Sequence, residues 1–205
     1  MSSHPLPLFP LETVLLPGAT LPLHIFEDRY KALIGECLAS GAEFGVNLSA
    51  EGSIAPVGCS AVVTRVTQRY PDGRLDVEVE GRRRYRVETT EPDRRPYLVG
   101  TVSFFGDREE PVDDTLARET VDLYNTLVRA AYQGRVPEQE YVAGKPVSFF
   151  LARKAGMAAA QRQTLLEETT ENGRLRLLRD YLVDVLPRIE RANEIERIVR
   201  SDGYL

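Results

Sequence analysis

Hydrophobic and polar residues follow two different periods along this chain, and the change comes near residue 106. Before it, short apolar segments are separated by Pro and Gly, and apolar residues mostly alternate with polar ones. After it, apolar residues recur every three or four positions, the period of an amphipathic helix. The charged segment 106–111 contains both Gly and Pro and predicts a linker. We therefore expect strands in residues 1–105 and helices in residues 112–205.

The clearest strand pair lies on either side of the sequence Tyr70-Pro-Asp-Gly73. Pro at the second position and Gly at the fourth are typical of a type I turn. Pairing Val66 with Val77 places the valines together on one face of the hairpin. The same register sets Arg65 opposite Glu78 on the other face. A shift by one residue would mix valines with carboxylates, so this register is favoured.

One helix and several further strands complete the first half. The helix is capped by Asp28 and ends at Gly41. Its apolar stripe consists of Tyr30, Leu33, Ile34, Cys37 and Leu38. The other strands are expected near 6–9, 20–26, 44–48, 83–90 and 97–105. Many short strands separated by Gly and Pro indicate a partly closed barrel.

The second half predicts a bundle of helices. Pro187 lies within the last of them and has no N–H for the carbonyl of Val183, so we expect a kink or a break there. The chain is thus predicted to be an α+β protein, a β-barrel with one inserted helix followed by a helical bundle. The expected helices run from Asp113-Asp114 to Gly134, from Pro146 to Gly156, over 159–168, and from Thr170-Glu171 to about Arg200.

Composition narrows the functional class. The 205 residues are 42% hydrophobic and 28% charged, which provides enough apolar material for a core. A net charge of -5 argues against a general nucleic-acid role. The N-terminus lacks the basic region of a secretory signal, and the longest uncharged segment, Thr13–Phe26, is too short to span a membrane. We expect a cytoplasmic protein without a membrane partner.

The residues that known catalytic sites require are missing or dispersed. Gly144-Lys145 is the only Gly-Lys pair, but Pro146 follows it and Gln139 stands where a phosphate-binding loop needs its first Gly. We therefore expect no enzymatic activity, no metal and no cofactor. The side chains that could ligate zinc lie too far apart in the sequence: His4, His24, Cys37 and Cys59.

An arginine-rich segment, Arg82-Arg-Arg-Tyr-Arg86, raises the possibility of RNA binding. Between residues 74 and 95, however, seven arginines face six acidic residues, a net charge of +1. Cross-strand ion pairs on an exposed sheet face account for this balance. The aromatic signature of a ribonucleoprotein module is also missing. RNA binding is therefore a less favoured alternative.

The first thirty residues carry the motif Pro-Leu-Phe-Pro followed by Leu-Pro-Gly-(x3)-Pro-Leu-x-Ile-Phe-Glu-x-Arg-Tyr. This pattern resembles the opening of the amino-terminal domain of Lon proteases, and the resemblance implies a PUA-like barrel. In Lon that domain precedes an ATPase module and a Ser–Lys protease module, and this chain stops before both. The resemblance continues through 43–46, 57–61, 72–74, 81–86, 163–167 and 174–178.

The Lon-like motif itself is best explained by folding. Pro17-Gly18 predicts a turn, and Ile25 and Phe26 are expected in the core. Glu27 and Arg29 flank the start of the helix, where a carboxylate favours the helix N-terminus. The motif residues to which we assign this structural role are Pro17, Gly18, Pro22, Leu23, Phe26, Glu27, Arg29 and Tyr30.

The resemblance implies a non-enzymatic module that binds unfolded or extended polypeptide, as in Lon substrate recognition. The ligand would lie in the crease between barrel and bundle or along a sheet edge. Candidate contacts are three aromatic residues near predicted strand ends, Tyr70, Tyr85 and Tyr97, for which the core is the alternative place. No oligomeric state is predicted.

Two other functions are kept as alternatives. One is an adaptor or regulator that binds a partner protease or ATPase through the last helix. It requires that an apolar stripe there stays uncovered: Ile189, Ile195, Ile198 and Val199. The other is a PUA-like RNA-binding module, which the resemblance to the PUA-like fold suggests.

Overall fold

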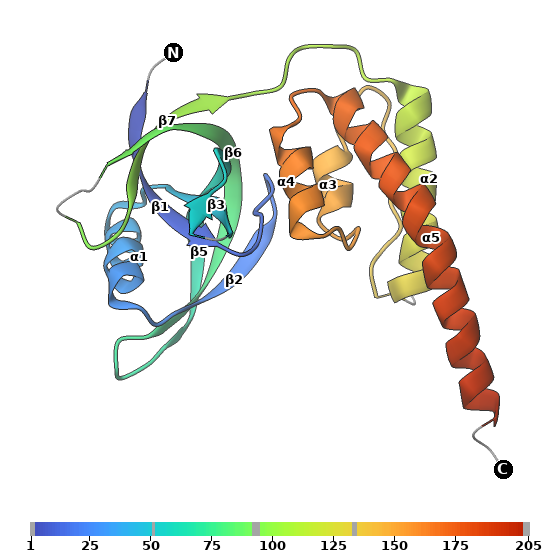
Figure 1. Cartoon of the computed structure of the whole chain (residues 1–205), viewed down its shortest axis with the longest axis horizontal. Coiled ribbons are helices and arrows are strands. Elements are labelled where there is room, and N and C mark those ends of the chain that lie inside the picture. The colour runs from blue at the N-terminus through green and yellow to red at the C-terminus, as the bar shows by residue number, and fades with distance from the viewer. Residues whose placement is uncertain (1–2, 51, 92–94, 133–134, 203–205) are drawn as a thin grey trace. The chain divides into compact units, whose positions relative to one another are not determined.

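The computed structural model describes residues 3–50, 52–91, 95–132 and 135–202 (Figure 1). The chain divides into two compact units. The first consists of Met1–Asp107 together with Ala158–Glu167, and the second of Arg108–Met157 together with Glu168–Leu205. The helix α4 (Ala159–Glu167), which the sequence pattern placed in the segment 112–205, thus belongs to the first unit.

The first unit is built on a closed ring of strands, which confirms the predicted α+β class and barrel. The strands follow the order β1-β7-β6-β5-β3, and β3 then pairs with β1 in parallel to close the ring. The short strand β4 (Ser53–Ile54) pairs with β3, and β2 (Thr20–Ile25) pairs with the first part of β6. The ring strands are β1 (His4–Leu11), β3 (Phe44–Ala50), β5 (Val57–Arg69), β6 (Leu75–Glu91) and β7 (Val99–Phe105).

The hairpin of β5 and β6 has the predicted register. Arg65 lies opposite Glu78 and Val66 opposite Val77, and the N–H of Gly73 donates to the carbonyl of Tyr70 over 3.0 Å. The expected strand 83–90 is not separate, because β6 is one strand of 17 residues. Gly81 interrupts the hydrophobic alternation without ending the strand. Its missing Cβ leaves room for the carbonyl of Leu16 from the loop that precedes β2.

The helix α1 (Asp28–Ser40) ends as predicted but begins differently. Gly41 terminates it with φ 71°, a left-handed conformation that glycine adopts without steric cost. Glu27, not Asp28, is the N-cap residue, and its side chain makes no capping hydrogen bond. Asp28 lies in the first turn instead, where its negative charge interacts favourably with the helix dipole. Leu38, expected in the apolar stripe, is 36% exposed, because the core contact ends at Cys37.

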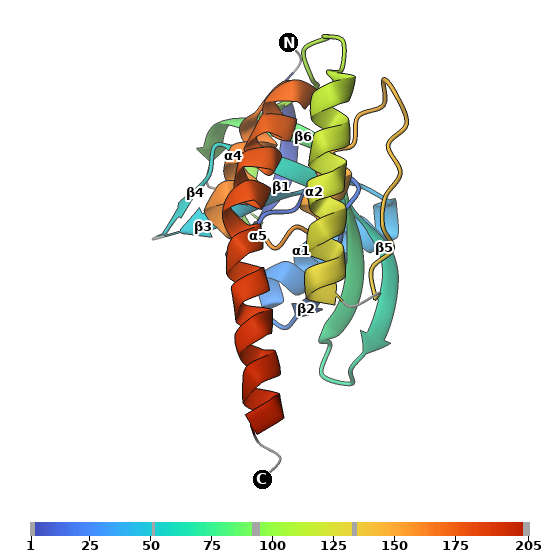
Figure 2. The same ribbon diagram turned by 90° about the vertical axis from the view of Figure 1, so that its right-hand side faces the viewer.

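In the residues that the structure describes, the second unit contains three helices: α2 (Asp114–Tyr132), α3 (Ser148–Ala152) and α5 (Glu171–Asp202). The carboxylate of Asp113 caps α2 by accepting the N–H groups of Thr115 and Leu116. The helices α2 and α5 lie side by side (Figure 2). A buried apolar cluster of Leu116, Ala117 and Leu175 joins them.

Helix α5 continues through Pro187, so of the two expected outcomes the break is wrong and the kink stays a prediction. Pro187 and Val183 are both exposed, so water can bind the Val183 carbonyl that lacks its helical partner. Of the helices in the described residues, none has the length and apolar composition needed to cross a membrane.

Candidate functional site

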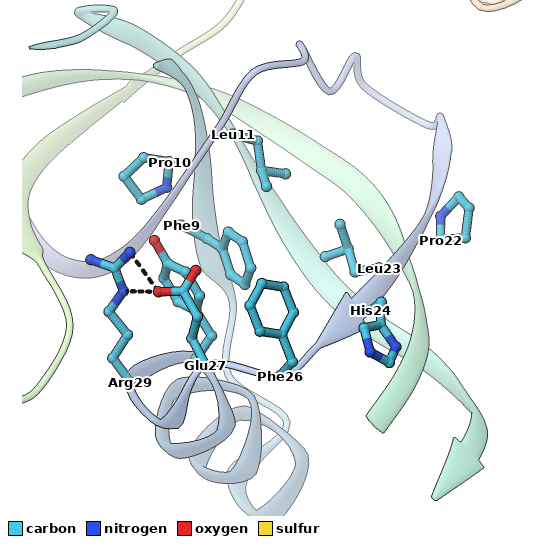
Figure 3. Close-up of a pocket in the computed structure, with 10 residues that line it drawn as sticks. Phe9, Pro10, Leu11, Pro22, Leu23, His24, Phe26, Glu27 and Arg29 are labelled. Carbon is cyan, nitrogen blue, oxygen red and sulfur yellow. Dashed lines mark hydrogen bonds and ion pairs between the residues drawn. The ribbon is translucent and has the colours of Figure 1, made fainter. Parts of the chain in front are cut away.

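A hollow of about 320 Å³ lies where the end of β1, strand β2 and the first turn of α1 meet (Figure 3). Strand β1 contributes Phe9, Pro10 and Leu11. Six of the eight motif residues that we assigned to folding also line it: Pro22, Leu23, Phe26, Glu27, Arg29 and Tyr30. The other two form the predicted turn, in which Gly18 has φ 67° and donates its N–H to the carbonyl of Gly81.

Phe26 is the most informative residue of this pocket. Its expected place in the core is wrong, because it is 59% exposed. Its neighbour Ile25, at the end of β2, is 1% exposed and takes the core-facing position. Successive strand side chains point to opposite faces, so Phe26 turns outward. Figure 3 shows Phe26 pointing toward the same space as Phe9, Leu11 and Leu23.

The floor of the pocket consists of two buried aromatic rings. The rings of Phe9 and Tyr30 stack with their centroids 3.9 Å apart and their planes 16° apart. Only 5% of Phe9 and 9% of Tyr30 are exposed. Burial raises the pKa of the Tyr30 phenol, so the ring stays neutral at physiological pH.

The rim carries two charges that compensate each other. The guanidinium of Arg29 lies 2.7 Å from a carboxylate oxygen of Glu27 and 4.6 Å from the centre of the Tyr30 ring. Both side chains of the ion pair are partly exposed, so the pair orients the rim more than it stabilises the fold. The charges of Glu27 and Arg29 therefore compensate each other at the rim of this pocket.

His24 brings a polar group to the edge of the pocket. Its Nδ1 lies 2.5 Å from Oδ1 of Asp76, and the hydroxyl of Tyr70 donates to the other oxygen of that carboxylate over 2.8 Å. The hydrogen bond with His24, followed by the one from Tyr70, lowers the pKa of Asp76. The lining residues include no Ser, Thr or Cys that the histidine could activate. This arrangement suits binding rather than nucleophilic catalysis.

The three candidate tyrosines lie in different places. Tyr85 is fully buried in the barrel, where its hydroxyl donates to Oδ1 of Asn47, and Gly45 and Gly58 leave the space that its ring fills. Tyr97 is 4% exposed and donates to Glu36 over 2.6 Å, and burial together with this bond raises its pKa to about 12. These two are core residues, the alternative that the sequence left open.

Tyr70 is the only one of the three that lies near the pocket. It is half-buried, and its ring meets that of His24 edge to face at 5.8 Å. It does not line the hollow itself but supports His24 through Asp76.

Three arginine side chains of the arginine-rich segment form ion pairs with carboxylates. Arg82 lies 3.5 Å from Glu80, and Arg83 lies 3.0 Å from Glu43. Arg84 is buried, pairs with Asp107, and donates to the carbonyl of Leu166 in α4. These pairs compensate three of the four arginines, and the fourth, Arg86, is exposed with its guanidinium 5.9 Å from the centre of the Phe105 ring.

Within the part of the chain that the structure describes, no three His, Cys, Asp or Glu side chains gather in a way that could hold a metal ion. Both thiols are buried. Burial raises the pKa of Cys37 to about 11 and that of Cys59 to about 12, so neither is a thiolate at neutral pH.

The sequence predicted none of the ten lining residues as a binding residue. Six were assigned to folding, and the other four were given no binding role: Phe9, Pro10, Leu11 and His24. Phe9, Pro10 and Leu11 belong to a proline-rich apolar segment that is not adjacent to β2 in the sequence. The signal that could have found them is the Lon-like motif, because it joins this segment to Pro22–Tyr30.

Comparison with known proteins gives one consistent result. The family model described as "ATP-dependent protease La (LON) substrate-binding domain" matches residues 5–184. The chain is 24% identical over 214 residues to a Lon protease of Flavobacterium johnsoniae, and 27% identical to one of Chloroherpeton thalassium. In each case the match covers 96% of this chain and 26% or 25% of the relative. The chain therefore spans about a quarter of the length of these curated relatives.

Solved structures agree with the family model. A Lon N-terminal domain protein from Xanthomonas campestris is 31% identical, with a TM-score of 0.67 over 85% of this chain and 96% of that one. The N-terminal domain of a Mycobacterium avium complex Lon protease is 22% identical, with a TM-score of 0.65 over 88% of this chain and 99% of that one. The second likeness bears on the fold alone.

Proposed function

This chain belongs to the family of ATP-dependent protease La (LON) substrate-binding domains, and on that premise we propose that it binds unfolded or extended polypeptide without enzymatic activity of its own. The binding site is the pocket around Phe26. Binding requires no ATP, because the pocket is formed by the barrel strands and the first turn of α1.

The observation that carries this proposal is the exposure of Phe26 over an apolar hollow. Contact with water is unfavourable for a large aromatic side chain that is 59% exposed, and a bound apolar side chain would remove part of that contact. Exposed aromatic residues beside a concave apolar surface are the usual anchors of protein interfaces. The polar groups at the rim, His24 and the Glu27–Arg29 pair, are placed to orient a peptide backbone.

The test is fluorescence anisotropy of a labelled, permanently unfolded polypeptide titrated with this protein in the absence of ATP. We expect saturable micromolar binding. Phe26→Ala should weaken it about tenfold, or about 1.4 kcal/mol. The matched control is Phe150→Ala, because Phe150 is 42% exposed in α3 and does not line the pocket. The control should bind like the unaltered protein.

Two results would contradict the proposal. One is an affinity for the unfolded polypeptide no better than for a folded control protein. The other is an equal loss of affinity in Phe26→Ala and Phe150→Ala, since that would indicate a general effect of surface hydrophobicity. Thermal unfolding of both variants verifies that each is folded.

One observation also favours the adaptor function. On the last part of α5, Ile195 is 56% exposed, Ile198 49% and Val199 64%, while Ile189 is half-buried. An apolar patch on one helix face suits a helical partner, such as a protease or ATPase subunit. A purified Lon protease should then bind the labelled chain, and Ile195→Glu should abolish this binding without affecting the unfolded polypeptide. Equal binding by the Ile195→Glu chain would exclude this face.

A further inference from the structure

We propose that the binding groove continues from the pocket around Phe26 into a second hollow, and that together they select an extended segment with a large apolar residue and, about three residues away, a lysine or arginine. This inference rests on the proposed function and narrows the class of polypeptide that the site binds.

The second hollow has a volume of about 510 Å³ and lies next to the first. Leu8, Ile54 and Leu98 form its apolar lining, and Glu12 and Ser49 add polar groups. Four residues line both hollows and therefore form their common wall: Pro10, Leu11, Arg29 and Tyr30. A chain that leaves one hollow across this wall enters the other.

The spacing follows from the strand that borders both hollows. Phe9 in β1 lines only the first, and Glu12, which directly follows the end of β1 at Leu11, lines only the second; they are three residues apart along the chain. An extended chain advances about 3.3 Å per residue, so this separation is about 10 Å. A ligand that runs alongside in an extended conformation covers it in the same number of residues.

The two hollows share the guanidinium of Arg29, and each adds one carboxylate, Glu27 in the first and Glu12 in the second. In the first, Arg29 is neutralised by Glu27 at 2.7 Å. In the second, Glu12 is exposed, and among the described residues it forms no ion pair with a basic side chain. The second hollow therefore presents a negative charge beside an apolar wall. A ligand ammonium or guanidinium group complements it, and the aliphatic stem of a lysine or arginine can lie along Ile54 and Leu98, which are partly exposed.

The experiment uses labelled short peptides without stable structure, measured by anisotropy at about 0.05 M and about 0.15 M salt. One pair carries Phe with Lys three residues after or three residues before it. In the other peptides, Lys is replaced by Glu, or Phe is replaced by Ala. Each peptide is titrated with the unaltered protein, Glu12→Gln and Phe26→Ala. The matched control is Glu190→Gln, because Glu190 is exposed on α5 and lies outside both hollows.

One of the two Phe/Lys peptides should bind on the order of tenfold more tightly than its Phe/Glu counterpart, more so at low salt. In Glu12→Gln this preference should fall below about threefold, while affinity for the Phe/Glu peptide is unchanged or higher. Glu190→Gln should keep the full preference.

The inference is overturned if Phe/Lys and Phe/Glu peptides bind equally, or if Glu12→Gln keeps the preference for lysine. The proposed polypeptide function still stands in that case if the peptide with Phe binds about tenfold more tightly than the peptide with Ala and Phe26→Ala removes this difference. If Phe and Ala peptides bind alike and Phe26→Ala has no effect, the proposed function itself fails.

Discussion

At the scale of single residues, aromatic side chains decide how this barrel is filled and where the candidate pocket lies. Tyr85 and Phe26 both lie in segments with strand character, yet one is fully buried and the other 59% exposed. The difference comes from what lies opposite each ring. Gly45 and Gly58 leave space for Tyr85, whereas Ile25 already occupies the core position beside Phe26.

The buried hydroxyl of Tyr85 is a residue-scale prediction. Tyr85→Phe leaves Oδ1 of Asn47 without its donor inside the barrel, so we expect the free energy of unfolding to fall by about 1–3 kcal/mol. Peptide binding should not change, because Tyr85 lines none of the pocket around Phe26. Denaturant titration measures the loss.

Tyr132→Phe is the control for this prediction. Its hydroxyl donates to the carbonyl of Lys154 over 2.9 Å near the surface, so its loss should cost about 0.5 kcal/mol or less. Equal losses of unfolding free energy in the two variants would show that burial of the Tyr85 hydroxyl does not increase the cost of removing it.

At the scale of elements, a buried ion pair at the start of α5 is hydrogen-bonded to the start of α3. The carboxylate of Glu171 accepts the N–H groups of Val147 and Ser148 at 2.6 and 2.8 Å and the hydroxyl of Ser148 at 2.6 Å. Arg174, which is 1% exposed, lies 2.7 Å from the same carboxylate. Glu171 thus satisfies the start of a five-residue helix that is too short to be stable alone.

Removing this carboxylate should destabilise the second unit strongly. Glu171→Ala leaves the Arg174 guanidinium buried without its main counter-charge, and we expect a loss of about 3–5 kcal/mol. The control is Asp184→Ala, which breaks the exposed pair of Asp184 with Arg188 and should cost about 1 kcal/mol or less. Chemical denaturation measures both losses of unfolding free energy. Comparable losses would contradict the prediction that the buried ion pair matters more than the exposed one.

At the scale of the whole molecule, the N-terminal strand closes the barrel. Strand β1 pairs with β7 through His4–Pro7 and in parallel with β3 through Leu8–Leu11. It also provides Phe9, Pro10 and Leu11 to the pocket around Phe26. The same strand therefore completes the fold and the candidate site.

Deleting residues 1–11 should abolish the fold of the first unit. The deletion exposes the hydrogen-bonding edges of β3 and β7 and removes the buried side chains of Leu6, Leu8 and Phe9. Amide hydrogen exchange should show lost protection throughout β5, β6 and β7, with aggregation through the open edges. A protected barrel in the truncated chain would show that the ring does not depend on β1. Deleting 1–3, which lie before β1, is the control.

Local patterns in the sequence by themselves determined the elements and several of their details. The register of β5 and β6, the end of α1 at Gly41 and the cap of α2 by Asp113 all follow from side chains within a few residues of each other. The Lon-like motif indicated the family, whose model matches residues 5–184, and the α+β barrel.

Only the tertiary structure decided the closure of the ring by β1 and β3, the membership of α4 in the first unit, and the exposure of Phe26. These properties depend on contacts between segments that are distant in the sequence, and hydrophobic periodicity carries no information about which segment covers which. The pocket is the clearest case. An apolar residue at a strand end is expected to be buried, but Phe26 lies at the candidate pocket and stays exposed because Ile25 takes the core position.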